Sequence, residues 1–410
     1  MLKLVLGTSG SGKTTLLYAR IRARAEAGKR SILLVPEQFT SSTEARIYRE
    51  LGDALSGMVE SYSFTSLAEH ILAIEGGAAV QTLTDAGRAV LVRRALEELQ
   101  DNVHYYYRHR RSAAFCQMAA ETIDELKSAG LSGQQLQELA RDCGTESAKL
   151  GELALIFQGY ESLLAGTGMD PADRLELAAD RLEAALARDE LPDFLREREV
   201  FIDEFDTFNA PKKRLMGAML AALPAVTVAL CEDGAPMQPG DLELFSGAKQ
   251  VAAQLRQLAR KNGAQVAAPE LLRRDLRHKD APGLAALTEL LETGSCTPPE
   301  SAPELRLFAA ASREEEARCA AAAIRRLMRQ GVRCGKIAVV CRDISLYRAA
   351  VRYEFRMAEI PLYCDEPTTP EFSAPATAVR ALLALLRGAD MTEQLTVLAK
   401  TGLCDLTEPE

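Results

Sequence analysis

The sequence predicts an α/β protein whose first sheet is parallel and carries a phosphate-binding loop. Three observations predict it: the complete pattern G-x-x-x-x-G-K-[ST] at Gly7–Thr14, an apolar strand before it at Leu2–Leu6, and a helix-forming run after it at Thr14–Ala27. The alternative reading is a chance glycine-rich turn, but strand, loop and helix together favour a phosphate site. In such a loop, backbone N–H groups and the positive end of the helix dipole face the phosphates.

The loop residues have distinct expected roles. Lys13 is expected to reach the β- and γ-phosphates of a nucleotide, and the Thr14 hydroxyl to bind Mg²⁺. ATP and Mg²⁺ are therefore the predicted cofactors. The residues expected to contact ATP are Gly7, Thr8, Ser9, Gly10, Ser11, Gly12, Lys13, Thr14 and Thr15.

After the loop, the chain continues to alternate strands and helices. Short apolar runs such as SILLV are typical of strands buried on both faces of a parallel sheet. The predicted elements are strand Ser31–Val35, helix Thr43–Leu51, strand Met58–Tyr62 and helix Ser66–Ile74. This alternation indicates a parallel α/β sheet.

From about residue 84 to 196 the pattern becomes helical only. Apolar residues recur at spacings of three and four, as in Leu91, Leu96 and Leu99, and no strand candidate interrupts them. Strands then return at Glu199–Ile202 and Ala225–Leu230, separated by a helix at Pro211–Leu223. The stretch 84–196 is therefore predicted to be a helical insertion in the first sheet domain.

A second α/β pattern follows a helix predicted at Ala281–Ser301 and a proline-rich boundary at Cys296–Pro303. Its predicted elements are strand Glu304–Ala309, helix Arg313–Gln330, strand Lys336–Cys341, helix Ile344–Ala358 and helix Ala374–Leu386. The domains predicted are 1–83 together with 197–298, the insertion 84–196, and a second, incomplete α/β domain at 303–410 that includes the beginning of an insertion of its own.

An acidic pair after the strand Glu199–Ile202 completes the predicted nucleotide site. Asp203 is expected to bind Mg²⁺, and Glu204 to orient or deprotonate the attacking water as the catalytic residue. Alone, an acidic loop after a strand is a weak signal. In a chain with a full phosphate-binding loop it favours ATP chemistry.

Composition limits the protein class. The 410 residues are too many for one typical core, and the net charge of −9 counts mildly against DNA binding by the chain as a whole. No stretch approaches the roughly 20 apolar residues that span a membrane, and the N-terminus reads as a core strand instead of a signal peptide. The nine cysteines lack metal-binding spacing, which predicts reduced, mostly buried thiols in a cytoplasmic protein.

Several segments resemble, in order, the motifs of superfamily 1 DNA helicases of the UvrD/Rep type. VPEQFTSSTEARI at Val35–Ile47 is similar to that family's motif Ia, and SYSFTSLAEHIL at Ser61–Leu72 to the segment after it. FIDEFDTFN at Phe201–Asn209 resembles its acidic box. IAVVCRD at Ile337–Asp343 looks like the start of a second motor domain. The resemblance implies two RecA-like sheets with the P-loop on the first.

A narrower resemblance is to AddB, the B-subunit family of the bacterial AddAB (RexAB) helicase–nucleases. The early P-loop paired with LLVPEQFT, and Gly159-Tyr160 followed by Asp170 and Asp173, carry it. It implies an N-terminal, helicase-like fragment that binds single- and double-stranded DNA beside an AddA-type motor subunit. The implied role is double-strand-break repair by homologous recombination, including recognition of the Chi sequence. The family's nuclease domain and iron–sulfur cysteines would lie in a C-terminal part.

Two departures from active helicases leave alternatives open. The stretch Cys231–Gly240 lacks the glutamine of motif III, and the segment of motif IV is missing, with Arg277 a weak candidate for its arginine and a plain surface arginine the alternative. ATP binding is expected, while hydrolysis by this chain is left open. The alternatives are an autonomous superfamily 1 helicase motor and a non-catalytic scaffold with a relic P-loop.

DNA contacts are predicted in two places. In the motif Ia region and the segment after it, Phe39 and Phe64 are candidate stacking residues, and Thr40 and Thr65 candidate phosphate contacts. The basic aromatic segment YYYRHRR at Tyr105–Arg111 adds a second set of candidates, Tyr106, Arg108 and Arg110. Core packing, helix capping, a partner interface or a solvated turn would explain the same residues equally simply.

Overall fold

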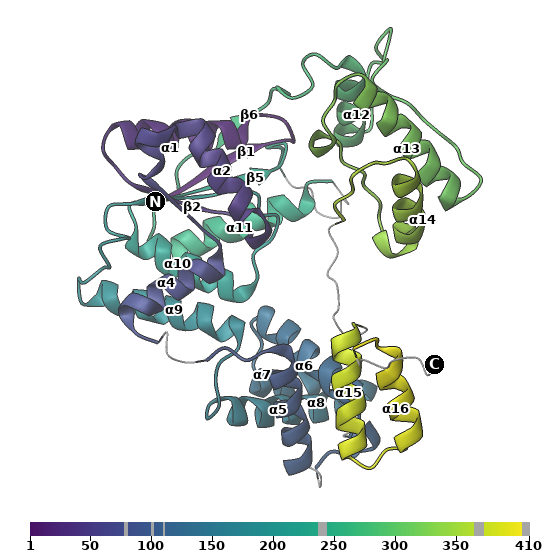
Figure 1. The fold of residues 1–410 in the computed structure, drawn as a ribbon. Helices are drawn as coiled ribbons and strands as arrows, with labels where there is room; N and C mark the ends of the chain where they lie inside the picture. The colour runs from purple at the N-terminus through teal and green to yellow at the C-terminus, as the bar shows by residue number, and fades with distance from the viewer. Residues whose placement is uncertain (78–80, 100–101, 110, 237–243, 365–372, 404–410) are drawn as a thin grey trace. The chain divides into compact units, whose positions relative to one another are not determined.

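The computed structural model consists of two units, Met1–Leu305 and Arg306–Glu410. It describes every residue except 78–80, 100–101, 110, 237–243, 365–372 and 404–410. The first unit holds a sheet with its covering helices and a helical region, and the described part of the second unit contains helices and connecting segments (Figure 1).

A six-stranded sheet forms the centre of the first unit. Its strands are β1 (Leu2–Gly7), β2 (Ser31–Leu34), β3 (Val59–Tyr62), β4 (Glu199–Ile202), β5 (Ala225–Cys231) and β6 (Glu270–Leu272). They lie in the order β3-β2-β4-β5-β1-β6, and every neighbouring pair is parallel. The predicted parallel α/β sheet is therefore confirmed. One strand, β5, separates β1 from β4, so the carboxyl ends of all three lie at one edge.

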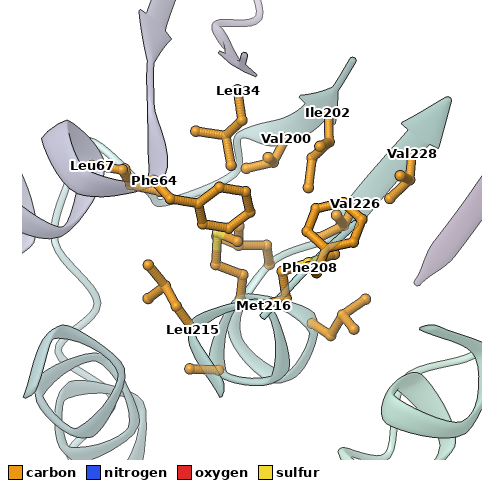
Figure 2. Close-up of a cluster of buried hydrophobic side chains, with 14 of the residues drawn as sticks. Leu34, Phe64, Leu67, Val200, Ile202, Phe208, Leu215, Met216, Val226 and Val228 are labelled. Atoms are coloured by element: carbon orange, nitrogen blue, oxygen red, sulfur yellow. The ribbon is translucent and has the colours of Figure 1, made fainter. Parts of the chain in front are cut away.

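Both faces of the sheet are buried, because alternate strand residues point to opposite sides. In β2, Ile32 and Leu34 belong to one core and Leu33 to the other. The first core, shown in Figure 2, is closed by α4 (Phe64–Glu75), α9 (Pro171–Ala187), α10 (Ala210–Ala222) and α11 (Ser246–Lys261). The second is closed by α1 (Lys13–Glu26) and α2 (Thr40–Leu51), with η1 (Glu37–Phe39) and α3 (Asp53–Ser56) beside α2. Burial on both faces explains the continuous apolar runs.

The helical region has its own core. Its elements are α5 (Asp85–Glu98), η2 (Tyr107–His109), α6 (Ala113–Ser128), α7 (Gly133–Ala140), η3 (Gly144–Glu146) and α8 (Ser147–Leu164), followed by α9. Phe157 and Tyr160 are among its most buried side chains. The helical periodicity predicted for this stretch is confirmed. Beyond it, α9 packs against α4 and α10 of the sheet region.

A buried polar cluster joins three of these helices. Lys127 of α6 is 9% exposed, and its Nζ lies 2.8 Å from Asp170 Oδ2 and 2.8 Å from Asp173 Oδ2. The Tyr160 hydroxyl of α8 donates to Asp170 Oδ1 at 2.7 Å. Asp170 itself is the N-cap of α9 and is 1% exposed. Every charge in the cluster therefore has a partner inside the protein.

Several elements were not predicted from the sequence. They are α11 and β6 in the first unit and α16 (Met391–Lys400) in the second. β6 has only three residues and lies at the sheet edge beside β1, so it carries no apolar run to recognise. The helix predicted at Ala281–Ser301 is shorter, α12 (Pro282–Thr293), because Gly294 ends it in the left-handed conformation at φ 77°.

In the second unit, helices α13 (Arg313–Arg329) and α14 (Ile344–Met357) share a small core with Ile324 and Phe355 at its centre. The short η4 (Cys334–Lys336) lies between them in sequence. Helix α15 (Ala374–Leu386) packs against α16.

The two strands predicted for the second unit, Glu304–Ala309 and Lys336–Cys341, are wrong. Neither segment forms a strand in the described residues, and Leu307 and Val340 are 99% and 90% exposed. A strand needs a neighbour to pair its N–H and C=O groups, and no described segment supplies one here. Apolar, β-branched sequence is therefore not sufficient for a strand.

The eight described cysteines are all free thiols, as predicted. The prediction that most are buried is wrong: Cys116 is buried, Cys143 is exposed and the other six are half-buried. Most of them lie on helices or connections that pack on one side only. Across the described ranges, no helix is long and apolar enough to cross a membrane.

Candidate nucleotide-binding site

The phosphate-binding loop connects the end of β1 to the start of α1. Gly10 and Gly12 adopt φ values of 82° and 92°, which other residues rarely tolerate. Gly12 is the N-cap of α1 and makes no side-chain cap. The first N–H groups of α1 are therefore left for a ligand, as in known anion sites at helix N-termini.

Lys13 is the first residue of α1 and points back into the loop. Its Nζ donates hydrogen bonds to the carbonyls of Gly7 and Thr8, each at 2.8 Å. Burial lowers the pKa of Lys13, and the nearby Cys231 and Asp203 oppose this only in part. The ammonium group is thus held by neutral carbonyls, and a phosphate would give it a stronger partner.

Thr14 and Asp203 meet at the end of the sheet, although they are far apart in sequence. Asp203 follows β4 and is 5% exposed, and the Thr14 hydroxyl donates to its carboxylate. Burial raises the pKa of Asp203, which a bound cation would counteract. A hydroxyl beside a carboxylate fits Mg²⁺, which keeps several waters and takes few protein oxygens. In the described residues, no group of three or more His, Cys, Asp or Glu side chains could hold another metal.

Glu204 has an unusual backbone. Its φ is 65°, and its N–H donates to Asp203 Oδ1 at 3.0 Å. Strain of this kind in a residue other than glycine is concentrated at functional sites. Burial, followed by the charge of Asp203, raises the pKa of Glu204. The turn holds the Glu204 carboxylate beside Thr14 and Asp203, the two candidate Mg²⁺ ligands, where it can accept a proton from water.

A cavity of about 580 Å³ opens beside these carboxylates. It lies over the ends of β2 and β4 and between residues of α1 and α2. Its lining residues include Thr14, Tyr18, Phe39, Thr43, Arg46, Arg49, Asp203, Glu204 and Asp206. Thr14 and Asp203 therefore border an open space that is lined by both polar and apolar side chains.

A segment after β6 lies over the P-loop. The Leu276 N–H donates to the Gly10 carbonyl at 3.0 Å, and the Arg277 guanidinium donates to Ser9 Oγ at 3.2 Å. A Cβ on Gly10 would come within 2.8 Å of the Arg277 Cβ, so this packing also requires glycine. Arg277 thus provides a second cation at the loop. The sequence offered it only as a weak candidate, because the motif around it is missing.

Glu292 of α12 also reaches the loop. Its carboxylate accepts a hydrogen bond from the Thr8 side chain and faces Lys13, and burial raises its pKa. Glu292 lies in no motif, so no sequence signal could have found it. Its negative charge competes with a phosphate for Lys13.

The first set of candidate DNA-contacting residues is only partly accessible. Phe39 is 37% exposed, while Phe64 is 2% exposed and packs edge-on against Phe205. Figure 2 shows Phe64 inside the core. Thr40 and Thr65 donate to Glu37, through its carbonyl and its carboxylate respectively. Phe64 is therefore a packing residue here, and Ser63 is the N-cap of α4, as the capping alternative predicts.

The residues of the basic aromatic segment Tyr105–Arg111 also differ in accessibility. Tyr106 packs against Phe115, with 5.2 Å between ring centroids, and belongs to the edge of the helical core. Arg108 is exposed, and Arg110 lies outside the described residues. The Glu152 carboxylate accepts hydrogen bonds from the backbone N–H groups of residues 104–106 at 2.7–3.1 Å. Glu152 thus anchors the segment, and Arg108 is left at the surface.

Comparison with known proteins finds the family described as ADDB, N-terminal, which matches residues 4–288. A relative from Moorella thermoacetica, named as the B subunit of an ATP-dependent helicase/deoxyribonuclease, is 33% identical over 379 residues, covering 89% of this chain and 32% of the relative. Relatives with the same name from Desulforudis audaxviator and Symbiobacterium thermophilum are 34% and 32% identical, covering 89% and 93% of this chain and 32% and 34% of their own lengths. The chain therefore spans about a third of the length of the curated relatives it matches.

Proposed function

The chain belongs to the family described as ADDB, N-terminal, and on that premise we propose that it is the helicase-like N-terminal part of the B subunit of an ATP-dependent helicase/deoxyribonuclease. In this proposal it binds ATP with Mg²⁺ and contacts single-stranded DNA while broken DNA is processed for homologous recombination. Its partner would be an AddA-type motor subunit, since relatives are named as one subunit of a complex. We place it in the cytoplasm, with the nucleoid.

One observation carries the nucleotide proposal. The P-loop follows β1, and the chain brings Lys13 and Thr14 to the same sheet edge as Asp203, which hydrogen-bonds to Thr14. Gly10 and Gly12 shape the loop so that backbone N–H groups can bind phosphate oxygens. Bound Mg²⁺ would neutralise phosphate charge. Lys13 would bind the phosphates. Glu204, next to the proposed Mg²⁺ ligands Thr14 and Asp203, would orient water.

The DNA part of the proposal rests on fewer residues. Phe39 and Arg108 have exposed side chains in the two predicted regions, and Arg108 lies in a basic aromatic segment. Exposed aromatic rings and arginines are the usual contacts to single strands. Recognition of Chi by this part is an extension of the same proposal.

A second candidate, a scaffold with a relic P-loop, has one observation in its favour. Lys13 is already hydrogen-bonded to its own loop, and Arg277 and Glu292 contact the same loop. A loop satisfied in this way keeps its shape without a nucleotide.

Titration of a fluorescent ATP analogue with Mg²⁺ distinguishes the two candidates. The 410-residue chain is expected to bind the analogue, and Lys13→Ala to bind it about 10- to 100-fold more weakly, because ionic hydrogen bonds to phosphate are lost. Lys261→Ala, a change at the exposed end of α11, is the matched control. Binding that is absent, or the same in Lys13→Ala, would favour the relic scaffold.

A further inference from the structure

The cavity beside Thr14 and Asp203 is also lined by two arginines. Arg46 and Arg49 of α2 line it opposite Asp203 and Glu204. None of these four residues belongs to the phosphate-binding loop, but Thr14 also lines the cavity, so the cavity adjoins the candidate nucleotide site. Its volume, about 580 Å³, is many times the roughly 30 Å³ that one water occupies.

We propose that this cavity is a second anion site, which takes inorganic phosphate while ADP and Mg²⁺ occupy the P-loop, with Arg46 as its main cation. The inference rests on the proposed ATP–Mg²⁺ function and deepens it. In ATP hydrolysis the oxygen of a water bonds to the γ-phosphorus, the bond to the β–γ bridging oxygen breaks, and phosphate, ADP and a proton result. The cavity lies where that phosphate would leave, beside Glu204.

Arg46 is prepared for an anion. Its guanidinium carbon lies 5.0 Å from the centroid of the Tyr18 ring, so the group stacks on the ring face. Stacking orients the guanidinium while leaving the N–H groups at its edge directed outward. Among the described residues, Arg46 has no ion-pair partner within 4 Å. Tyr18 is 6% exposed, and burial raises its pKa to about 12, so the ring stays neutral near pH 7.

The other lining groups suit a tetrahedral oxyanion. Thr43 brings a hydroxyl group and Gln38 an amide, both of which can donate hydrogen bonds, whereas Ser42 Oγ already donates to the Phe39 carbonyl at 2.9 Å. Thr43 is 6% exposed, so its side chain is a buried part of the cavity lining. A cavity with several neutral donors around a stacked arginine matches how proteins bind phosphate.

The charge balance makes the site depend on the metal. The two arginines face the three carboxylates of Asp203, Glu204 and Asp206, so the cavity disfavours anions by itself. A divalent cation at Thr14 and Asp203 reverses the sign of the local charge. Phosphate binding is therefore expected only with Mg²⁺ present. A DNA phosphate is the less favoured occupant, since Thr14 and Asp203, the proposed Mg²⁺ ligands, line the cavity.

The test is a titration of inorganic phosphate into the 410-residue chain loaded with ADP and Mg²⁺, followed by ³¹P NMR. Wild type is expected to bind phosphate, and Arg46→Met to bind it at least about tenfold more weakly with unchanged ADP affinity. Arg46→Lys, which keeps the charge and loses the planar stack, is expected to fall between them. Arg94→Met, an exposed arginine on α5, is the control and is expected to behave as wild type.

The outcomes separate this inference from the proposed function. ADP binding with equal phosphate affinity in wild type and Arg46→Met overturns the inference alone. Phosphate binding that persists without Mg²⁺ also overturns the inference alone. So does displacement of phosphate by a short thymidine oligonucleotide whose binding requires Arg46, because that result would assign the site to DNA. Absence of Lys13-dependent ADP binding overturns both proposals. Thermal melting of each variant checks that it is folded.

Discussion

Two lysines in the first unit, Lys127 buried and Lys13 half-buried, show that similar side chains can have different roles. Lys127 is hydrogen-bonded to the carboxylates of Asp170 and Asp173, and Lys13 only to the backbone carbonyls of Gly7 and Thr8. Burial alone would lower the pKa of both. Hydrogen bonds to the two aspartates outweigh burial and raise the pKa of Lys127, whereas burial prevails at Lys13 and lowers its pKa.

The two lysines differ in whether a carboxylate contacts them directly, and the proposed phosphate ligand would supply the contact that Lys13 lacks. At Lys127 both oxygens of the Asp170 carboxylate have partners, since Tyr160 donates to one and Lys127 to the other. At Lys13 the positive charge is matched by no carboxylate in direct contact, and the neighbouring N–H groups of α1 make no side-chain cap. A buried charge without a counter-charge costs free energy, and an incoming phosphate would recover it.

Lys127→Met carries the largest expected effect on stability. It leaves Asp170, which is 1% exposed, without its cation, and breaking a buried pair from one side costs about 3–5 kcal/mol. Chemical denaturation of the 410-residue chain, followed through the first unit, measures it. Lys149→Met on α8, where the side chain is 46% exposed, is the control, with an expected change within about 0.5 kcal/mol. Equal stabilities would remove the structural role of Lys127.

The fold of the first unit could largely be predicted, because its strands are apolar runs with clear ends. β4 was predicted to the residue, and β1 within one residue. β6 was missed because three residues at an edge carry no periodic signal. The two strands wrongly predicted in the second unit show the opposite error, in which an apolar segment forms no strand. Pairing depends on a neighbouring strand, and the residues of a segment do not reveal whether one is there.

The site could be predicted only where a motif fixes it. Lys13, Thr14 and Asp203 were predicted as phosphate and Mg²⁺ ligands because that chemistry requires those residue types after those strands, and the structure brings Thr14 and Asp203 into contact. Arg277 and Glu292 reach the loop through packing of distant segments, and Arg46 through its helix beside Tyr18. Such contacts depend on tertiary structure, so the sequence pattern alone does not contain them. Phe64 was a stacking candidate with core packing as the alternative, because stacking and core aromatics look alike in sequence, and its burial favours the alternative.

Lys13→Met is expected to separate binding from stability. Nucleotide affinity should fall about 10- to 100-fold, while the free energy of unfolding changes by less than about 1 kcal/mol, since the lysine is bonded only to carbonyls of a half-exposed loop. Denaturation without nucleotide and titration with it measure the two quantities. A loss of several kcal/mol would show that Lys13 has the same structural role as Lys127.

Glu292→Gln is expected to strengthen nucleotide binding. The change removes a negative charge that faces Lys13 while keeping a hydrogen-bond acceptor for Thr8. The gain should be roughly two- to fivefold, the range of partly exposed charge interactions. Titration with the fluorescent ATP analogue measures it, and Glu289→Gln, on the exposed side of α12, is the matched control. Weaker binding in Glu292→Gln would instead make Glu292 part of the nucleotide site.

The smallest expected effect is a difference in pH dependence between the two lysines. Lys127 has a raised pKa, so its contribution to stability is fully present below the ordinary lysine value of 10.5 and is lost only as the pH rises through the higher folded value. Lys13 has a lowered pKa, so it loses its proton at a lower pH than an ordinary lysine. Phosphate binding needs the charged form, and nucleotide affinity should therefore decline, by a few-fold at first, at a pH where stability from Lys127 is intact. Parallel titrations of nucleotide affinity and unfolding between roughly pH 8 and 10.5 measure both, and binding should be accompanied by proton uptake at the alkaline end. An affinity that stays constant up to 10.5 would mean that the loop carbonyls hold the Lys13 ammonium as firmly as the aspartates hold Lys127.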